Sequence, residues 1–128
     1  MTEGIARSGF DIDLRDGKAA EKSLAHMLLN SAAGHLIEVK SDELCRKTGN
    51  LFIEFKQKGR PSGIATTEAH YWAFQYDKNC WLIVPTERLK GQARNAYAQG
   101  LITRGGDFDQ YEGVLLPIEW LVKPMKAV

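Results

Sequence analysis

The sequence predicts a single α/β domain in which helices flank a mixed central sheet. Three observations lead to this prediction: 128 residues suffice for one core, 44% of them are hydrophobic and 26% charged, and segments of helical period alternate with segments of strand period. The predicted order is α, β-β, α, β, α, β, which is typical of an α/β sandwich. Residues 1–16 show no clear period and are predicted to form an N-terminal arm, which leaves residues 17–128 for the domain.

The first predicted helix covers residues 17–33, which are rich in Ala, Leu, Lys and Glu, with Asp16 as its N-cap. At about 100° per residue, Glu21 falls in the same stripe as Leu24 and Leu28. A glutamate on the apolar face of a helix is unusual, so Glu21 is a candidate functional residue.

Two predicted strands follow. In residues 35–42 the polar side chains of Glu38, Lys40 and Asp42 alternate with apolar ones and so share one face. Residues 50–57 alternate in the same way, which places Glu54 and Lys56 on a common face. Because Gly49 and Asn50 supply turn residues between them, we expect the two strands to form an antiparallel pair.

The rest of the chain predicts two further helices and two further strands. Residues 64–77 are expected to form a helix capped by Thr66 or Thr67, and the apolar run 80–85 a central buried strand. A third helix is expected over residues 86–100, capped by Thr86 and ended by Gly100. Residues 113–118 are expected to add a short strand that Pro117 interrupts.

Several classes of protein are disfavoured by composition. No run of about 18 apolar residues is present and the N-terminus lacks an apolar secretory stretch, so we expect a cytoplasmic protein that does not enter a membrane. Cys45 and Cys80 lack zinc-ligand spacing, and no sequence pattern indicates an organic cofactor. The net charge of +1 is not that of a protein that coats nucleic acid, yet six basic residues crowd between Lys40 and Arg60.

Acidic residues within that basic segment predict metal-assisted chemistry on a polyanion. Cleavage of a phosphodiester with a divalent ion needs oxygen ligands and a group that orients water. Asp42 and Glu54 can supply the oxygens, and Lys56, on the same face as Glu54, can reach the same space. A second Glu-x-Lys, formed by Glu38 and Lys40, leaves an alternative register open.

Residues 17–84 are expected in the order helix-strand-strand-helix-strand, and they carry Glu21, Asp42 and the tripeptide Glu54-Phe55-Lys56. In these features the chain resembles the PD-(D/E)XK nucleases. The spacing of these residues is similar to that of archaeal-type Holliday junction resolvases, and residues 48–55 and 59–72 look like segments of small phage-encoded nucleases. The resemblance implies a restriction-endonuclease-like α-β-β-α-β core and a DNA-cleaving enzyme that leaves a 5′-phosphate and a 3′-hydroxyl. Ser41 stands where the nominal motif has proline.

The resemblance also implies a site. Asp42, Glu54 and the carbonyl of Phe55 would bind Mg²⁺, for which Mn²⁺ would substitute, Lys56 would orient the attacking water, and Glu21 would assist. DNA is the expected partner, contacted by the basic or polar side chains of flanking loops: Lys47, Lys58, Arg60 and Thr67.

Two questions of function stay open on the sequence. The first is whether the chain cleaves DNA, is a catalytically silent nucleic-acid-binding module on the same fold, or is an unrelated protein whose acidic residues are structural. The second is oligomeric state, because a homodimer would place two active sites on a duplex or a branched DNA. The apolar residues 114–122 are either its interface or part of the protein's own core.

Overall fold

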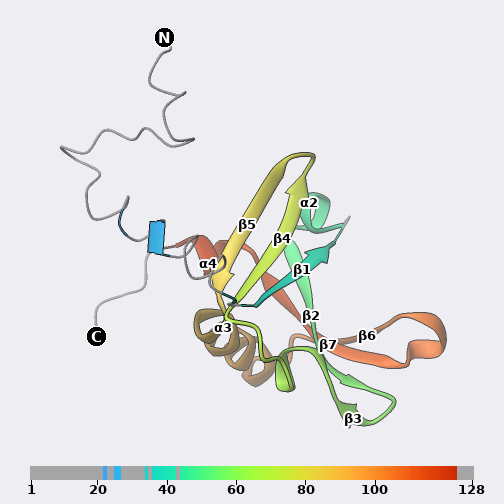
Figure 1. Ribbon diagram of the computed structural model, residues 1–128. Coiled ribbons are helices and arrows are strands. Elements are labelled where there is room, and N and C mark those ends of the chain that lie inside the picture. Colours follow the sequence, from blue (N-terminus) through green and yellow to red (C-terminus); the bar gives the residue numbers. More distant parts are fainter. Residues whose placement is uncertain (1–21, 23–24, 27–33, 35, 43, 124–128) are drawn as a thin grey trace. The chain divides into compact units, whose positions relative to one another are not determined.

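The computed structural model describes residues 36–42 and 44–123, together with positions 22, 25, 26 and 34 (Figure 1). The predicted arm and Glu21 therefore lie outside the described residues, as does the predicted helix 17–33 apart from three isolated positions. The chain divides into two units after His35, and every element described below belongs to the second, residues 36–128. Within the described residues, no helix is long and apolar enough to cross a membrane.

This unit is an α/β protein with a mixed three-strand sheet, a four-strand antiparallel sheet and few helices. Its elements, in chain order, are β1 (Ile37–Ser41), α2 (Cys45–Thr48), β2 (Asn50–Gln57), β3 (Arg60–Pro61), η2 (Gly63–Ala65), β4 (Tyr71–Asp77), β5 (Cys80–Pro85), α3 (Thr86–Ala98), β6 (Ile102–Gly105), η3 (Asp107–Asp109), β7 (Tyr111–Pro117) and α4 (Glu119–Val122).

The two strands expected to pair with each other belong to different sheets. β1 runs parallel to β4, and β4 pairs antiparallel with β5, in the order β1-β4-β5. β2 lies in the order β3-β2-β7-β6, where every pair is antiparallel. The predicted antiparallel pairing of β1 with β2 is therefore wrong. The segment between them is not a tight turn: it forms α2, which ends at Gly49 with φ of 76°, and the chain enters the second sheet.

The second predicted helix is also wrong, because residues 64–77 form the single turn η2, a loop and the strand β4. In β4 the side chains of Trp72 and Phe74, two residues apart, are both buried, and their ring centroids are 6.0 Å from each other. Aromatic residues pack well on a pleated surface, and this burial outweighs the helical spacing of the same segment. The strand then turns back through Asn79, whose φ is 57°.

The remaining predicted elements are present, with differences in detail. β5 is a strand as predicted, but it is an edge strand rather than a central one, and Trp81 is 44% exposed. α3 is confirmed, although the hydroxyl of Thr86 donates to the carbonyl of Ala69 instead of capping the helix. β7 confirms the predicted strand that contains Pro117. The four-residue strand β6 was not predicted.

The core lies between α3 and the two sheets. Its largest buried side chains are contributed by five of these elements, namely α2, β2, β4, α3 and β7: Cys45, Leu51, Ile53, Trp72, Phe74, Leu89, Val114 and Leu116. Most of the apolar C-terminal stretch belongs to this core, since Val114, Leu116 and Leu121 are buried. The packing thus favours residues 114–122 as part of the protein's own core over a dimer interface. Leu115 and Val122 are the exposed exceptions.

Candidate functional site

Asp42 follows the last residue of β1 and connects the two sheets. Its Oδ1 accepts a hydrogen bond from the backbone N–H of Leu44 at 3.1 Å, which forms the turn into α2. Its Oδ2 accepts one from the backbone N–H of Phe52 in β2, also at 3.1 Å. Both carboxylate oxygens are therefore held in place, while each keeps a second lone pair for another partner.

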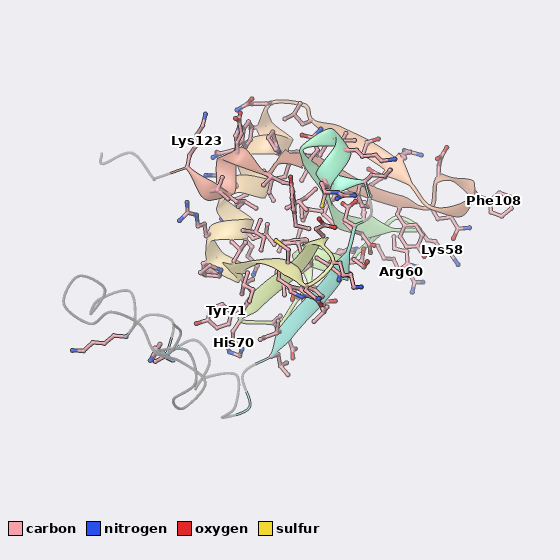
Figure 2. The ribbon with its side chains drawn as sticks, turned by 90° about the horizontal axis from the view of Figure 1, so that it is seen from above. Lys58, Arg60, His70, Tyr71, Phe108 and Lys123 are labelled. Carbon is pink, nitrogen blue, oxygen red and sulfur yellow. The ribbon has the colours of Figure 1, made fainter. Side chains whose placement is uncertain are left out.

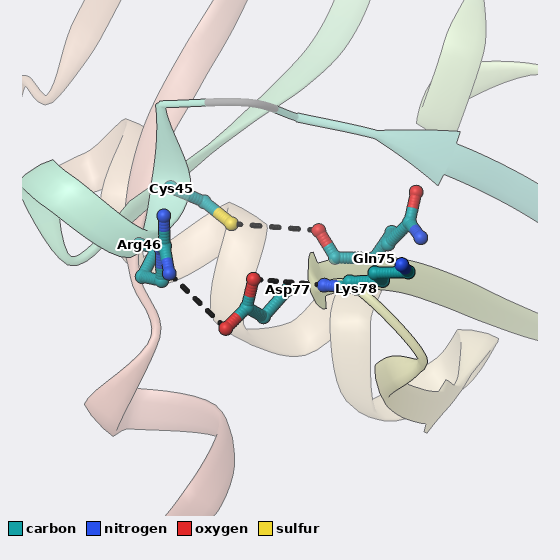
Figure 3. Close-up of polar contacts among 5 residues, drawn as sticks. All are labelled: Cys45, Arg46, Gln75, Asp77 and Lys78. Carbon is teal, nitrogen blue, oxygen red and sulfur yellow. Dashed lines mark hydrogen bonds and ion pairs between the residues drawn. The ribbon is translucent and has the colours of Figure 1, made fainter.

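The turn that carries Asp42 is anchored by α2 (Figure 3). Arg46 pairs with the carboxylate of Asp77 at 3.1 Å, and the same carboxylate accepts the backbone N–H of Lys78 at 2.8 Å. The Sγ of Cys45, which is fully buried, lies 3.9 Å from the carbonyl of Gln75. Burial raises the pKa of the Cys45 thiol, with a smaller contribution from the charge of Asp42.

Glu54 lies on β2 and is held by the loop after β3. The hydroxyl of Ser62 donates to Oε2 of Glu54 at 2.6 Å, and the backbone N–H of Ser62 donates to the carbonyl of Phe55 at 3.0 Å. Gly63, with φ of 54°, packs so closely on this strand that a Cβ at position 63 would lie 2.9 Å from the backbone carbon of Glu54. A side chain there would displace Glu54 or the loop.

Lys56 does not share a face with Glu54, because β2 contains a bulge between them. Glu54 is opposite Gly113 of β7, whereas Lys56 is opposite Glu112. Gly113 and Glu112 are consecutive and point to opposite faces, so their partners do as well. The predicted common face for Glu54 and Lys56 is therefore wrong: the bulge adds one residue and reverses the alternation after Glu54.

A different lysine lines the same pocket as Asp42 and Glu54. A pocket of about 480 Å³ is lined by residues of β1, β2, β4 and the turn between β1 and α2: Lys40, Ser41, Asp42, Leu44, Phe52, Glu54 and Trp72. The Nζ of Lys40 lies 3.5 Å from the carboxylate of Glu38 and 5.6 Å from the centroid of the Trp72 ring. The structure thus brings together Asp42, Glu54 and Lys40.

The inward position of Lys40 follows from the register of β1. Glu38 and Lys40 are opposite Trp72 and Phe74, the buried residues of β4, so the charged face of β1 is the inner one. The expected common face of Glu38, Lys40 and Asp42 agrees with this arrangement. Val39, on the other face, is 59% exposed within the described residues.

Two carboxylates with backbone carbonyls and water match the ligand preference of Mg²⁺, which is usually bound through one or two carboxylates. The described residues contain no group of three or more His, Cys, Asp or Glu side chains able to hold a metal ion. The two carboxylates, Asp42 and Glu54, are the donors with which this pocket would hold a hard cation, with waters as its other ligands.

The expected DNA-contacting residues are in three places. Lys47 lies on α2, Lys58 and Arg60 are exposed where β2 turns into β3, on the same side of this unit as Phe108 (Figure 2), and Thr67 lies before β4. Thr67 is not at a helix N-terminus, because its segment is a loop, and its Oγ1 accepts the backbone N–H of Ala69 at 3.1 Å. Thr67 therefore has a local turn role.

Ser62 and Trp72 are site residues that sequence reasoning missed. Ser62 is in a Gly/Pro-rich loop where a turn role is the ordinary expectation, and nothing in the sequence indicates its contact with Glu54. Trp72 was expected on a helix. Its indole Nε1 is buried without a hydrogen-bond acceptor in the described structure, and its ring lies at the wall of the pocket.

Comparisons of the chain with protein-family models, with curated proteins and with solved structures found no match.

Proposed function

We propose that this protein is a divalent-metal-dependent nuclease that cleaves DNA at the pocket between β1 and β2. One observation carries the proposal: Asp42, which follows β1, and Glu54, which lies on β2, line the same pocket together with Lys40. Paired carboxylates beside an ammonium group are the set that metal-assisted hydrolysis of a phosphodiester needs.

In this proposal, Mg²⁺ is held by Asp42 and Glu54, and Mn²⁺ substitutes for it. The free lone pairs of the Asp42 carboxylate and Oε1 of Glu54 are the available ligand atoms, and the carbonyl of Phe55 has one lone pair beyond its bond to Ser62. When bound, the ion polarises a phosphate oxygen and makes a bound water more acidic. Ser62 orients Glu54 through its hydroxyl.

Lys40 is assigned the role that the resemblance gives to Lys56. Its ammonium group, between the Glu38 carboxylate and the Trp72 ring, lies at the pocket wall, where it can orient a water or stabilise the negative charge that develops on the phosphate. Lys56 is on the other face of β2. Glu21 remains a proposed assisting acid, outside the described residues.

A restriction-endonuclease-like core remains part of the proposal, on the motif residues alone. The order of elements no longer supports it, because residues 64–77 are not a helix and β1 does not pair with β2. DNA as substrate is supported by the exposed cations Lys47, Lys58 and Arg60. A homodimer, and a preference for branched DNA, rest on the resemblance.

Cleavage assays test the proposal. Supercoiled plasmid, linear duplex, single strand and a four-way junction are incubated with Mg²⁺, with Mn²⁺ and with EDTA. We expect metal-dependent cutting that Asp42→Asn and Glu54→Gln each reduce by about a hundredfold or more. Lys40→Ala should reduce it comparably and Lys56→Ala less, while Lys78→Ala, whose side chain does not line the pocket, should leave cutting unchanged.

The outcomes separate the alternatives. Loss of activity in Lys56→Ala with an active Lys40→Ala would restore the Glu54-x-Lys56 assignment. Binding of DNA with no metal-dependent cutting of any substrate would favour the silent binding module. Absence of both DNA binding and cutting would favour an unrelated protein whose acidic residues are structural, an alternative that the loop-holding hydrogen bonds of both carboxylates support.

A further inference from the structure

A second pocket lies on the opposite face of β2 from Glu54, between that strand and α3. It has a volume of about 280 Å³, and its lining combines an apolar floor, two aromatic rings and two cations: Phe55, Ile64, Ala65, Lys90, Ala93, Arg94, Tyr97 and Val114. The nuclease proposal uses none of these side chains; it draws on this lining only through the backbone carbonyl of Phe55.

The floor of this pocket is buried and its mouth is aromatic. Ile64, Ala93 and Val114 are at most 8% exposed. The rings of Phe55 and Tyr97 meet edge to face, with centroids 5.6 Å apart and planes at 80°. Tyr97 is nevertheless 56% exposed, so a large part of its ring remains accessible to a planar group.

The charge at the mouth is positive. Lys90 and Arg94 are one helical turn apart on α3 and both line the pocket. Among the described residues, the carboxylate paired with Lys90 is that of Glu87, at 4.0 Å, and the Glu87 side chain is 88% exposed. Arg94 has no ion pair within the described part of the chain, and its guanidinium group offers the forked donors that suit phosphate.

The geometry points to a binding site for a nucleotide, with the base stacked on Tyr97 over the apolar floor and the phosphate bound by Arg94 and Lys90. A planar ring that carries an anion satisfies both halves of the lining, which neither an apolar ligand nor a bare phosphate does. The floor offers only apolar side chains to a base, so recognition is expected to be tolerant of base identity.

Two sources supply this chemistry: a free mononucleotide, or an unstacked nucleotide of a DNA strand. Only binding of a DNA strand rests on the proposed function, since the pocket would then bind a nucleotide of the same DNA that the enzyme cleaves. The strand β2 connects the two sites, because its consecutive residues Glu54 and Phe55 point to opposite faces and line one pocket each.

Calorimetric titration of the full chain in EDTA tests this inference independently of cleavage. The probes are thymidine 5′-monophosphate, thymidine, inorganic phosphate and an eight-residue oligothymidylate. We expect the monophosphate or the oligonucleotide to bind, and thymidine and phosphate to bind roughly tenfold more weakly or worse. Tighter binding of the oligonucleotide assigns the site to a strand, and tighter binding of the monophosphate assigns it to a free nucleotide.

Matched variants locate the binding. Tyr97→Ala and Arg94→Gln should each weaken the binding roughly tenfold. Tyr97→Phe keeps the ring and Lys78→Gln removes a cation elsewhere, so both should bind as the unaltered protein does. Equal affinity in all four variants, phosphate binding as tightly as the nucleotide, or no binding of either nucleotide probe at millimolar concentration would overturn the inference.

Discussion

Replacement of Gly63 by alanine tests how the loop after β3 holds Glu54. Gly63 has φ of 54°, so any side chain there incurs the strain of the left-handed region, about 1–2 kcal/mol. The added Cβ would also lie 2.9 Å from the backbone carbon of Glu54 and still closer to its carbonyl oxygen. Displacing that strand costs about 1–3 kcal/mol more, by analogy with overpacked cores. We expect Gly63→Ala to lower the free energy of unfolding by about 2–5 kcal/mol.

Gly59→Ala is the matched control for this substitution. Gly59 has φ of 77°, and a Cβ there would meet nothing within 4 Å, so only the strain common to both sites applies. The two free energies of unfolding, measured by urea denaturation, should therefore differ by about 1–3 kcal/mol, the cost of the contact with Glu54. If both substitutions destabilise equally, Gly63 does not position Glu54 in the way described. If Gly63→Ala also loses metal-dependent cleavage while Gly59→Ala keeps it, the placement of Glu54 and the proposed function are supported together.

Three further predictions follow from single contacts. In the native protein a thiol reagent should modify exposed Cys80 quickly and buried Cys45 only on unfolding. Because the pKa of the Cys45 thiol is raised in the folded state, the free energy of unfolding should fall as the pH rises above the ordinary thiol pKa. Urea denaturation at several pH values should show this fall, and Cys45→Ala should make it smaller. Mg²⁺ should raise the melting temperature by binding only the folded state, and Asp42→Asn should reduce this rise; an unchanged rise would remove Asp42 from the ligand set. Arg46→Ala should cost less than about 1 kcal/mol, since its ion pair with Asp77 is half exposed, and a larger loss would mean that the pair anchors α2 more strongly than its exposure implies.

Local patterns in the sequence were sufficient for several elements. β2 has the predicted bounds, and β5, α3 and β7 fall where the apolar runs and helix formers indicate. Period and propensity act over a few residues, so they are readable without knowledge of the partner strands. The same locality explains why Glu38 and Lys40 were placed correctly on one face of β1, whereas Asp42 lies just beyond the end of that strand.

Sequence also named Asp42 and Glu54 as candidates, and the structure places both at one pocket. It misplaced residues 64–77 as a helix, whereas Trp72 and Phe74, two residues apart, are buried as neighbours on one face of the strand β4. Whether such a segment forms a helix or a strand depends on the strands available to pair with it, which here are β1 and β5.

Only the tertiary structure decided which lysine accompanies the two carboxylates. Alternation along β2 predicted Lys56, and it fails because pairing with β7 accommodates one extra residue at Phe55. A bulge depends on both strands of a pair, so a single strand's sequence does not reveal it. Lys40 reaches the pocket because β1 pairs with β4, and this pairing turns the charged face of β1 inward. The sequence of residues 35–42 alone does not determine with which strand β1 pairs.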